Sequence, residues 1–110
     1  MPGFEERQRM LKQYLKKYLE GASGATRIVV DPSVDDDLLL SVASRTEGFS
    51  GREIAKLAIA WQAAAYGSTN AAFGPELLES VLAAHKDQKA RKQLWNSAAA
   101  SDHSAPLITK

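Results

Sequence analysis

The 110-residue chain contains no cysteine, only two histidines, and few aromatic residues, which make up 7% of the sequence. The missing thiols exclude disulfides, cysteine nucleophiles and thiolate metal sites. The 14 Lys and Arg residues nearly balance the 13 Asp and Glu residues, which argues against bulk electrostatic binding to nucleic acid or membranes. The longest apolar stretch, residues 57–66, is interrupted by Gln62 and falls far short of the roughly 20 residues that a membrane-spanning helix needs. The composition therefore predicts one small globular domain, with no membrane span and no targeting peptide.

Four segments carry apolar residues at intervals of three and four, which is the period of an amphipathic helix. They cover residues 4–20, the stretch between Ser33 and Gly48, the stretch from Ser50 to about residue 66, and the stretch from Pro75 to about residue 95. The third has the clearest start, because Ser50 and Glu53 have the spacing of a capping box. Strand signals are nearly absent, apart from a short extended stretch allowed at residues 28–30. The sequence predicts an all-α fold, with a small four-helix bundle in residues 1–95 and a disordered tail in residues 96–110.

No constellation in the sequence predicts a catalytic or a metal site. Asp35, Asp36 and Asp37 are consecutive, so their side chains point to different sides of a helix; we interpret them as first-turn acids that complement the helix dipole. The Gly-Ala-Ser-Gly stretch at residues 21–24 lacks the lysine of a phosphate loop and is interpreted as a linker. His85 lies on an apolar helical face without a serine or carboxylate to complete a relay, and we expect a partly buried core residue there.

A basic cluster lies towards the end of the fourth segment, close to Trp95. Its members are Lys86, Lys89, Arg91 and Lys92. They could contact the phosphates of a nucleic acid, but basic residues are also favoured near a helix C-terminus by the backbone dipole. The dipole interpretation is the more economical one, and no nucleic-acid partner is predicted.

Arg52 does not fit its local surroundings. It falls in the first turn of the third segment, where free backbone amides disfavour a cation by about 0.3–1 kcal/mol. An anion such as a phosphate would be favoured there, because the amides and the guanidinium fork both donate hydrogen bonds to it. Gly51 permits close approach of the backbone. The alternative is that Glu53 or another carboxylate neutralises Arg52, and the residues alone leave both hypotheses open.

Two stretches resemble the small C-terminal helical lid of AAA+ ATPases. One is the pair Pro2 and Arg7 leading into the first helix, and the other is Thr46-Glu-Gly-Phe-Ser-Gly-Arg-Glu-Ile54, which opens the third. The resemblance covers about residues 2–95, and within the superfamily residues 50–66 are most similar to a mitochondrial inner-membrane member. It implies a lid-type bundle that packs on a larger nucleotide-binding subdomain, closes over ATP and belongs to a homo-oligomeric ring, usually a hexamer.

The resemblance also implies roles for single residues. Arg52 matches the sensor-two arginine that approaches the triphosphate, Gly51 would lie near the adenine and ribose, and Tyr14 matches a position that flanks the base. Many members of the narrower AAA clade have alanine where this chain has Arg52, so the arginine is a departure from them. The phosphate loop, magnesium-binding acids and arginine fingers of the family have no counterpart in the 110 residues. ATP and magnesium would therefore be held upstream, and the chain alone is expected to hydrolyse nothing.

We therefore expect the lid of a mitochondrial AAA+ ATPase, at the inner membrane with this domain on the matrix side. Contact with the membrane would be made only by other parts of the parent protein. The alternative is a free-standing helical interaction module that binds no nucleotide and uses an exposed apolar patch. A phosphate-loop motif encoded upstream of Met1 would favour the lid.

Overall fold

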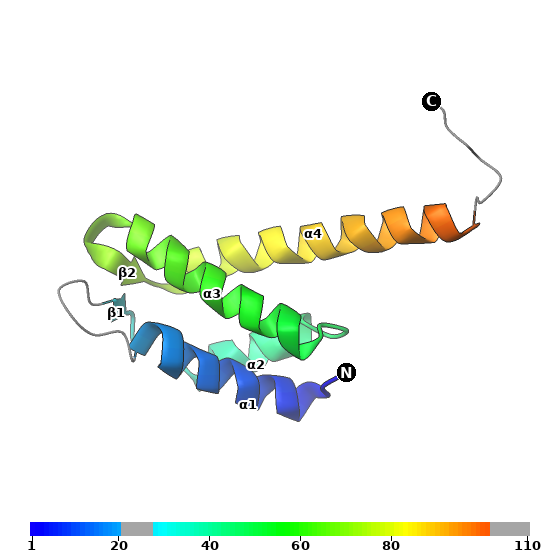
Figure 1. Cartoon of the computed structure of the whole chain (residues 1–110). Helices are drawn as coiled ribbons and strands as arrows, with labels where there is room; N and C mark the ends of the chain where they lie inside the picture. The colour runs from blue at the N-terminus through cyan, green and yellow to red at the C-terminus, as the bar shows by residue number, and fades with distance from the viewer. Residues whose placement is uncertain (21–27, 102–110) are drawn as a thin grey trace.

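The computed structural model describes residues 1–20 and 28–101 (Figure 1). Its four α-helices are α1 (Phe4–Leu15), α2 (Asp36–Arg45), α3 (Gly51–Gly67) and α4 (Pro75–Ser101). The shorter elements are the π-helical turn η1 (Lys16–Glu20), the 3-10 turn η2 (Thr69–Ala71) and the strands β1 (Val29–Val30) and β2 (Ala72–Phe73). The prediction of an all-α fold with four helices is confirmed. The predicted linker at residues 21–24 and His103 lie outside the described residues.

Helix α3 occupies the centre of the bundle. It packs against α1 on one side and α4 on the other, while α2 packs against α1 (Figure 1). Two contacts show that α1 and α3 run alongside each other in the same direction. A Cβ atom built on Gly51 would lie 3.2 Å from Cε of Met10, and the Gln62 side-chain amide donates to the Tyr18 carbonyl oxygen at 2.8 Å.

The apolar residues of the helical repeats form one core around Trp61. This side chain is fully buried, its indole N–H donates to the Leu78 carbonyl oxygen at 3.2 Å, and its ring lies 5.7 Å from that of Phe73. The surrounding buried side chains come from all four helices and include Leu11, Leu15, Leu39, Val42, Ile54, Leu57 and Leu82. The buried donor is satisfied, so the large indole fills the centre without an unpaired polar atom.

The two short strands pair in parallel, with Val29 opposite Ala72 and Val30 opposite Phe73. The extended stretch allowed at residues 28–30 is therefore present, whereas β2 was not predicted. Asn70 and Ala71 have positive φ values of 62° and 49°, and they turn the chain from α3 into β2. A strand of two residues is too short to show the alternation on which strand prediction depends.

Helix α4 runs from Pro75 through Ser101, so its last six residues fall within the predicted tail at residues 96–110. Residues 102–110 of that tail lie outside the described residues. The distal part of α4 projects away from the other helices (Figure 1). Trp95, in the last part of the helix, is 75% exposed. No helix in the described part of the chain is long and apolar enough to cross a membrane.

Arg7 is a buried cation that joins α1 to the end of α2. Its Nε and one terminal nitrogen donate to the Ala43 carbonyl oxygen at 3.0 and 2.8 Å, and the other terminal nitrogen donates to the Pro2 carbonyl oxygen at 3.1 Å. Ala43 lies in the last turn of α2, where carbonyl groups lack helical partners and the dipole favours positive charge. The Thr46 hydroxyl donates to the Val42 carbonyl oxygen in the same turn. The guanidinium therefore donates hydrogen bonds to backbone carbonyl groups that the packing of α1 shields from water.

We expect Arg7→Met to lower the free energy of unfolding by about 1–3 kcal/mol, because the side chain keeps its apolar stem but leaves the Ala43 carbonyl buried without its strongest donors. Urea denaturation followed by far-ultraviolet circular dichroism measures the change. Arg9→Met, on the exposed side of α1, is the matched control and should change stability by less than about 0.5 kcal/mol. Equal stability of the two variants would show that the buried guanidinium contributes nothing.

Candidate functional site

Helix α3 begins with the predicted capping box. The Ser50 hydroxyl accepts a hydrogen bond from the backbone N–H of Glu53 at 3.2 Å, and the Glu53 carboxylate accepts one from the backbone N–H of Ser50 at 2.8 Å. Gly51 and Arg52 follow as the first residues of the helix. Because both bonds must form together, the helix starts at a defined residue, and the position of Arg52 is set by local structure.

The carboxylate of Glu53 is also paired with Lys89 from the middle of α4. The ammonium donates to both carboxylate oxygens at 3.0 Å and lies 5.5 Å from the ring centroid of Phe49. Burial by itself raises the pKa of Glu53, but the hydrogen bonds from Ser50 and Lys89 outweigh burial and lower the pKa below its ordinary value. Glu53 is therefore a paired carboxylate at neutral pH, and its partners are Ser50 and Lys89.

The guanidinium of Arg52 is exposed at the start of α3. Glu53 does not neutralise it, because that carboxylate faces Lys89, and no other carboxylate of the described residues forms an ion pair with it. Among the described residues, the positive charge of Arg52 therefore adds to the positive end of the helix dipole without a compensating acid.

Arg52 opens an exposed stripe along α3, which we call the α3 outer face. Its exposed side chains recur at intervals of three and four: Arg52, Lys56, Ile59, Ala63 and Tyr66. Ile59 is 46% exposed and Tyr66 is 42% exposed. The outer face thus carries two cations near the start of the helix and two large apolar side chains further along it.

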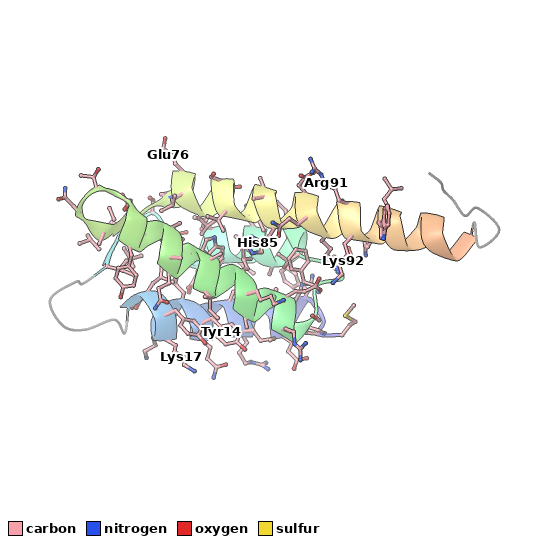
Figure 2. The ribbon with its side chains drawn as sticks, turned by 45° about the horizontal axis from the view of Figure 1, so that its top comes forward. Tyr14, Lys17, Glu76, His85, Arg91 and Lys92 are labelled. Atoms are coloured by element: carbon pink, nitrogen blue, oxygen red, sulfur yellow. The ribbon has the colours of Figure 1, made fainter. Side chains whose placement is uncertain are left out.

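Gly51 and Tyr14 lie where the outer face adjoins α1. Because Gly51 has no side chain, the Met10 side chain of α1 can lie close to it. The group that approaches Gly51 closely is therefore part of α1. Tyr14 lies one turn beyond Met10, is half-buried and stacks on Tyr18 with ring centroids 5.9 Å apart. Figure 2 shows Tyr14 on the side of the bundle where α1 and α3 meet. Gly51, Tyr14 and Arg52 are therefore brought to neighbouring parts of the α1–α3 surface, and their predicted contacts with a nucleotide stay predictions.

The acidic run Asp35–Asp37 lies at the start of α2, with Asp35 as its N-cap and Asp36 and Asp37 in its first turn. The Asp35 carboxylate accepts from the backbone N–H of Leu38 at 3.0 Å, and Asp36 pairs with Lys12 at 3.3 Å. This agrees with the interpretation of these residues as acids that stabilise the first turn.

The residues singled out on α4 have different surroundings. His85 is partly buried, as predicted, with Nδ1 3.2 Å from the Val81 carbonyl oxygen. Arg91 pairs with Asp87 one turn earlier at 3.1 Å, and Lys89 pairs with Glu53. Two members of the predicted basic cluster are therefore neutralised by carboxylates of this chain. The sequence showed Glu53 as a capping residue but contained no signal for its partner on α4.

Comparisons with known proteins found no family model and no solved structure that matches the chain, but they found relatives by sequence. The chain is 37% identical over 107 residues to ATPase family AAA domain-containing protein 3 of Xenopus tropicalis, covering 96% of this chain and 18% of that protein. It is 35% identical over 99 residues to ATPase family AAA domain-containing protein 3A homolog of Drosophila melanogaster, covering 88% and 16%. It is 34% identical over 97 residues to ATPase family AAA domain-containing protein 3A of Homo sapiens, covering 86% and 17%.

These similarities define the class: the chain is related to the AAA+ ATPases. More narrowly, it belongs to the ATPase family AAA domain-containing protein 3 family, and it corresponds to a C-terminal segment of those relatives. It spans less than a fifth of the length of these three relatives. The resemblance noted in the sequence is confirmed at this level.

The ion pair of Glu53 predicts a dependence of stability on pH. Its pKa is lower in the folded chain than in the unfolded chain, so ionised Glu53 stabilises the fold above the unfolded pKa, and this contribution is lost as pH falls through the folded pKa. We expect Glu53→Gln to reduce the free energy of unfolding at pH 7 by up to about 1 kcal/mol, since the pair is partly screened by solvent. The amide oxygen of Gln can still accept from Ser50, so the substitution removes mainly the charge.

The difference in the free energy of unfolding between the Glu53→Gln variant and the unsubstituted chain should become smaller as pH is lowered from 7 to about 3. Urea denaturation at each pH measures it. Glu47→Gln removes an exposed carboxylate just before α3 and is the control. If the difference in the free energy of unfolding does not change with pH, the assigned ion pair between Glu53 and Lys89 is wrong.

Proposed function

We propose that the chain is the lid subdomain of a larger AAA+ ATPase, in which Arg52 contacts the phosphates of ATP held by a separate nucleotide-binding domain. The observation that carries the proposal is the position of Arg52. Its guanidinium is exposed in the first turn of α3, while Glu53, the acid next to it in sequence, is committed to Lys89.

A polyphosphate is the type of anion that such an arrangement favours. The first amides of α3 and the helix dipole favour negative charge, and the guanidinium can donate two parallel hydrogen bonds to phosphate oxygens. Lys56 adds a second exposed cation one turn along the same face. ATP would supply the reactive phosphoanhydride, whereas the role of Arg52 is to bias the lid towards its closed position. A charged hydrogen bond of about 1.5–3 kcal/mol changes such an equilibrium by one to two powers of ten.

The apolar part of the α3 outer face supports docking on a larger domain. Ile59 and Tyr66 follow Arg52 at intervals of seven residues, so all three lie on one side of the helix. A domain that covers Ile59 and Tyr66 would therefore meet Arg52 along the same surface. We propose that Gly51 lies near the ribose and adenine at this junction and that Tyr14 flanks the base.

The membership of the chain in its family supports oligomeric assembly of the parent protein, and we propose a homo-oligomeric ring, a hexamer by analogy with the superfamily. From the resemblance seen in the sequence alone, we also propose that the parent protein resides at the mitochondrial inner membrane with this domain on the matrix side. Magnesium would be bound with ATP by the upstream domain.

A free-standing interaction module is the second candidate function. Leu94 and Trp95 favour it, because they are 73% and 75% exposed on the projecting part of α4. Large exposed apolar side chains of this kind are typical of contacts with protein partners. A phosphate-loop motif encoded upstream of Met1 would favour the lid, and its absence would favour the module.

Replacing the matching segment of the Xenopus tropicalis relative with this chain allows the role of Arg52 to be tested in a complete protein. We expect Arg52→Ala in this chimaera to weaken ATP affinity or ATP turnover by about 10- to 100-fold, because one charged contact to phosphate is lost. Arg52→Lys should retain part of the activity, since it keeps the charge but not the fork. Steady-state ATP hydrolysis and nucleotide titration measure both quantities.

Arg91→Ala in the same chimaera is the matched control, because it removes an exposed arginine that pairs with Asp87 on α4. It should leave both quantities unchanged. Unchanged ATP affinity and turnover in the Arg52→Ala chimaera would reject the proposed contact.

A further inference from the structure

A second cationic feature lies between α3 and α4, where a cavity of about 160 Å³ opens to solvent. The side chains that decide its chemistry are Glu53 and Lys56 from α3 and His85, Gln88, Lys89 and Lys92 from α4. Figure 2 shows His85 and Lys92 on the side of α4 that faces α3, while Arg91 points away from it. Arg52, the residue proposed to contact ATP, does not line this cavity, although Lys56 adjoins both features.

The charges around the cavity do not balance. Three lysines against one carboxylate leave a formal charge of 3 − 1 = +2 when His85 is neutral. Only Lys89 pairs with Glu53, and no carboxylate of the described residues pairs with Lys56 or Lys92, both of which are exposed. The lining of the cavity therefore carries an excess of positive formal charge, and no ion pair within the described residues involves Lys56 or Lys92.

Lys89 is held in place before any ligand binds. Two of the three N–H donors of its ammonium are directed to the Glu53 oxygens at 3.0 Å, and its side chain is only 17% exposed. The ring of Phe49 lies 5.5 Å from the nitrogen and adds a cation–π contact. One N–H donor is left for a ligand, and little side-chain freedom remains to be lost when the ligand binds.

We propose that this cavity binds a phosphate monoester. A monoester carries about 1.5 to 2 negative charges at pH 7, which matches the charge of +2, whereas a diester such as a nucleic-acid backbone carries one. Lys89 would contact the phosphate from the base of the cavity, and Lys56 and Lys92 would contact it from either side. The amide of Gln88 supplies a neutral donor. This site goes beyond the proposed lid function and does not depend on it.

Methyl phosphate and dimethyl phosphate form a matched pair of probes for this site, because they differ by one methyl group and by about 0.5 to 1 charge at pH 7. Isothermal titration calorimetry of the 110-residue chain at low ionic strength should show saturable binding of methyl phosphate and binding of dimethyl phosphate at least about tenfold weaker. The double variant Lys56→Met and Lys92→Met should weaken methyl phosphate binding by at least about tenfold. Both lysines are exposed, and circular dichroism checks that the fold is retained.

Two control variants show whether methyl phosphate binds in this cavity. Lys16→Met with Lys17→Met removes the same charge from η1 and should leave binding unchanged, which excludes a bulk charge effect. Arg52→Ala should also leave it unchanged, which separates this site from the proposed contact with ATP. The proposal is overturned if methyl phosphate does not bind, if dimethyl phosphate binds equally well, if the η1 variant loses as much affinity as the cavity variant, or if Arg52→Ala abolishes binding.

Discussion

The carboxylate of Glu53 connects two parts of the structure, the start of α3 and the middle of α4. It accepts the backbone N–H of Ser50, which defines where α3 begins, and it accepts the ammonium of Lys89, which holds α4 against α3. The same pairing has two consequences for the surface. Arg52 is left without the carboxylate next to it in sequence, and Lys89 is held in the lining of the α3–α4 cavity. The pairing of Glu53 with Lys89 therefore bears on both proposed anion contacts.

Sequence periodicity was sufficient for the helices because their signals are local. The start of α3 at Ser50 and of α4 at Pro75 each follow from residues within one helical turn. The interactions that join the helices lack such signals. Arg7 reaches the Ala43 carbonyl, and Lys89 reaches Glu53, across 36 residues of sequence in each case. Nothing in the sequence around Arg7 or Lys89 distinguishes these two cations from ordinary surface cations. Only the packing of the helices reveals their partners.

The candidate site shows the same division between local and distant information. Arg52 could be singled out because a cation in a first turn conflicts with the helix dipole, and that conflict is visible in a few residues. Whether Glu53 neutralises Arg52 depends on which cation Glu53 pairs with. That cation is Lys89, which lies on α4. Gly51 illustrates the limit of a local rule: a glycine beside a predicted site permits close approach, but the group that approaches it here is Met10.

The small net charge of the chain conceals how its charges are distributed. A formal charge of +1 argues against a strong field around the whole molecule, but it places no limit on a single cavity. The acids Asp35, Asp36 and Asp37 lie at the start of α2, where Asp35 caps the helix and Asp36 pairs with Lys12 of α1. None of the three lines the cavity or forms an ion pair with its lysines. These acids therefore count towards the net charge of the chain without pairing with the lysines between α3 and α4, and a nearly neutral protein can still present a site for a dianion.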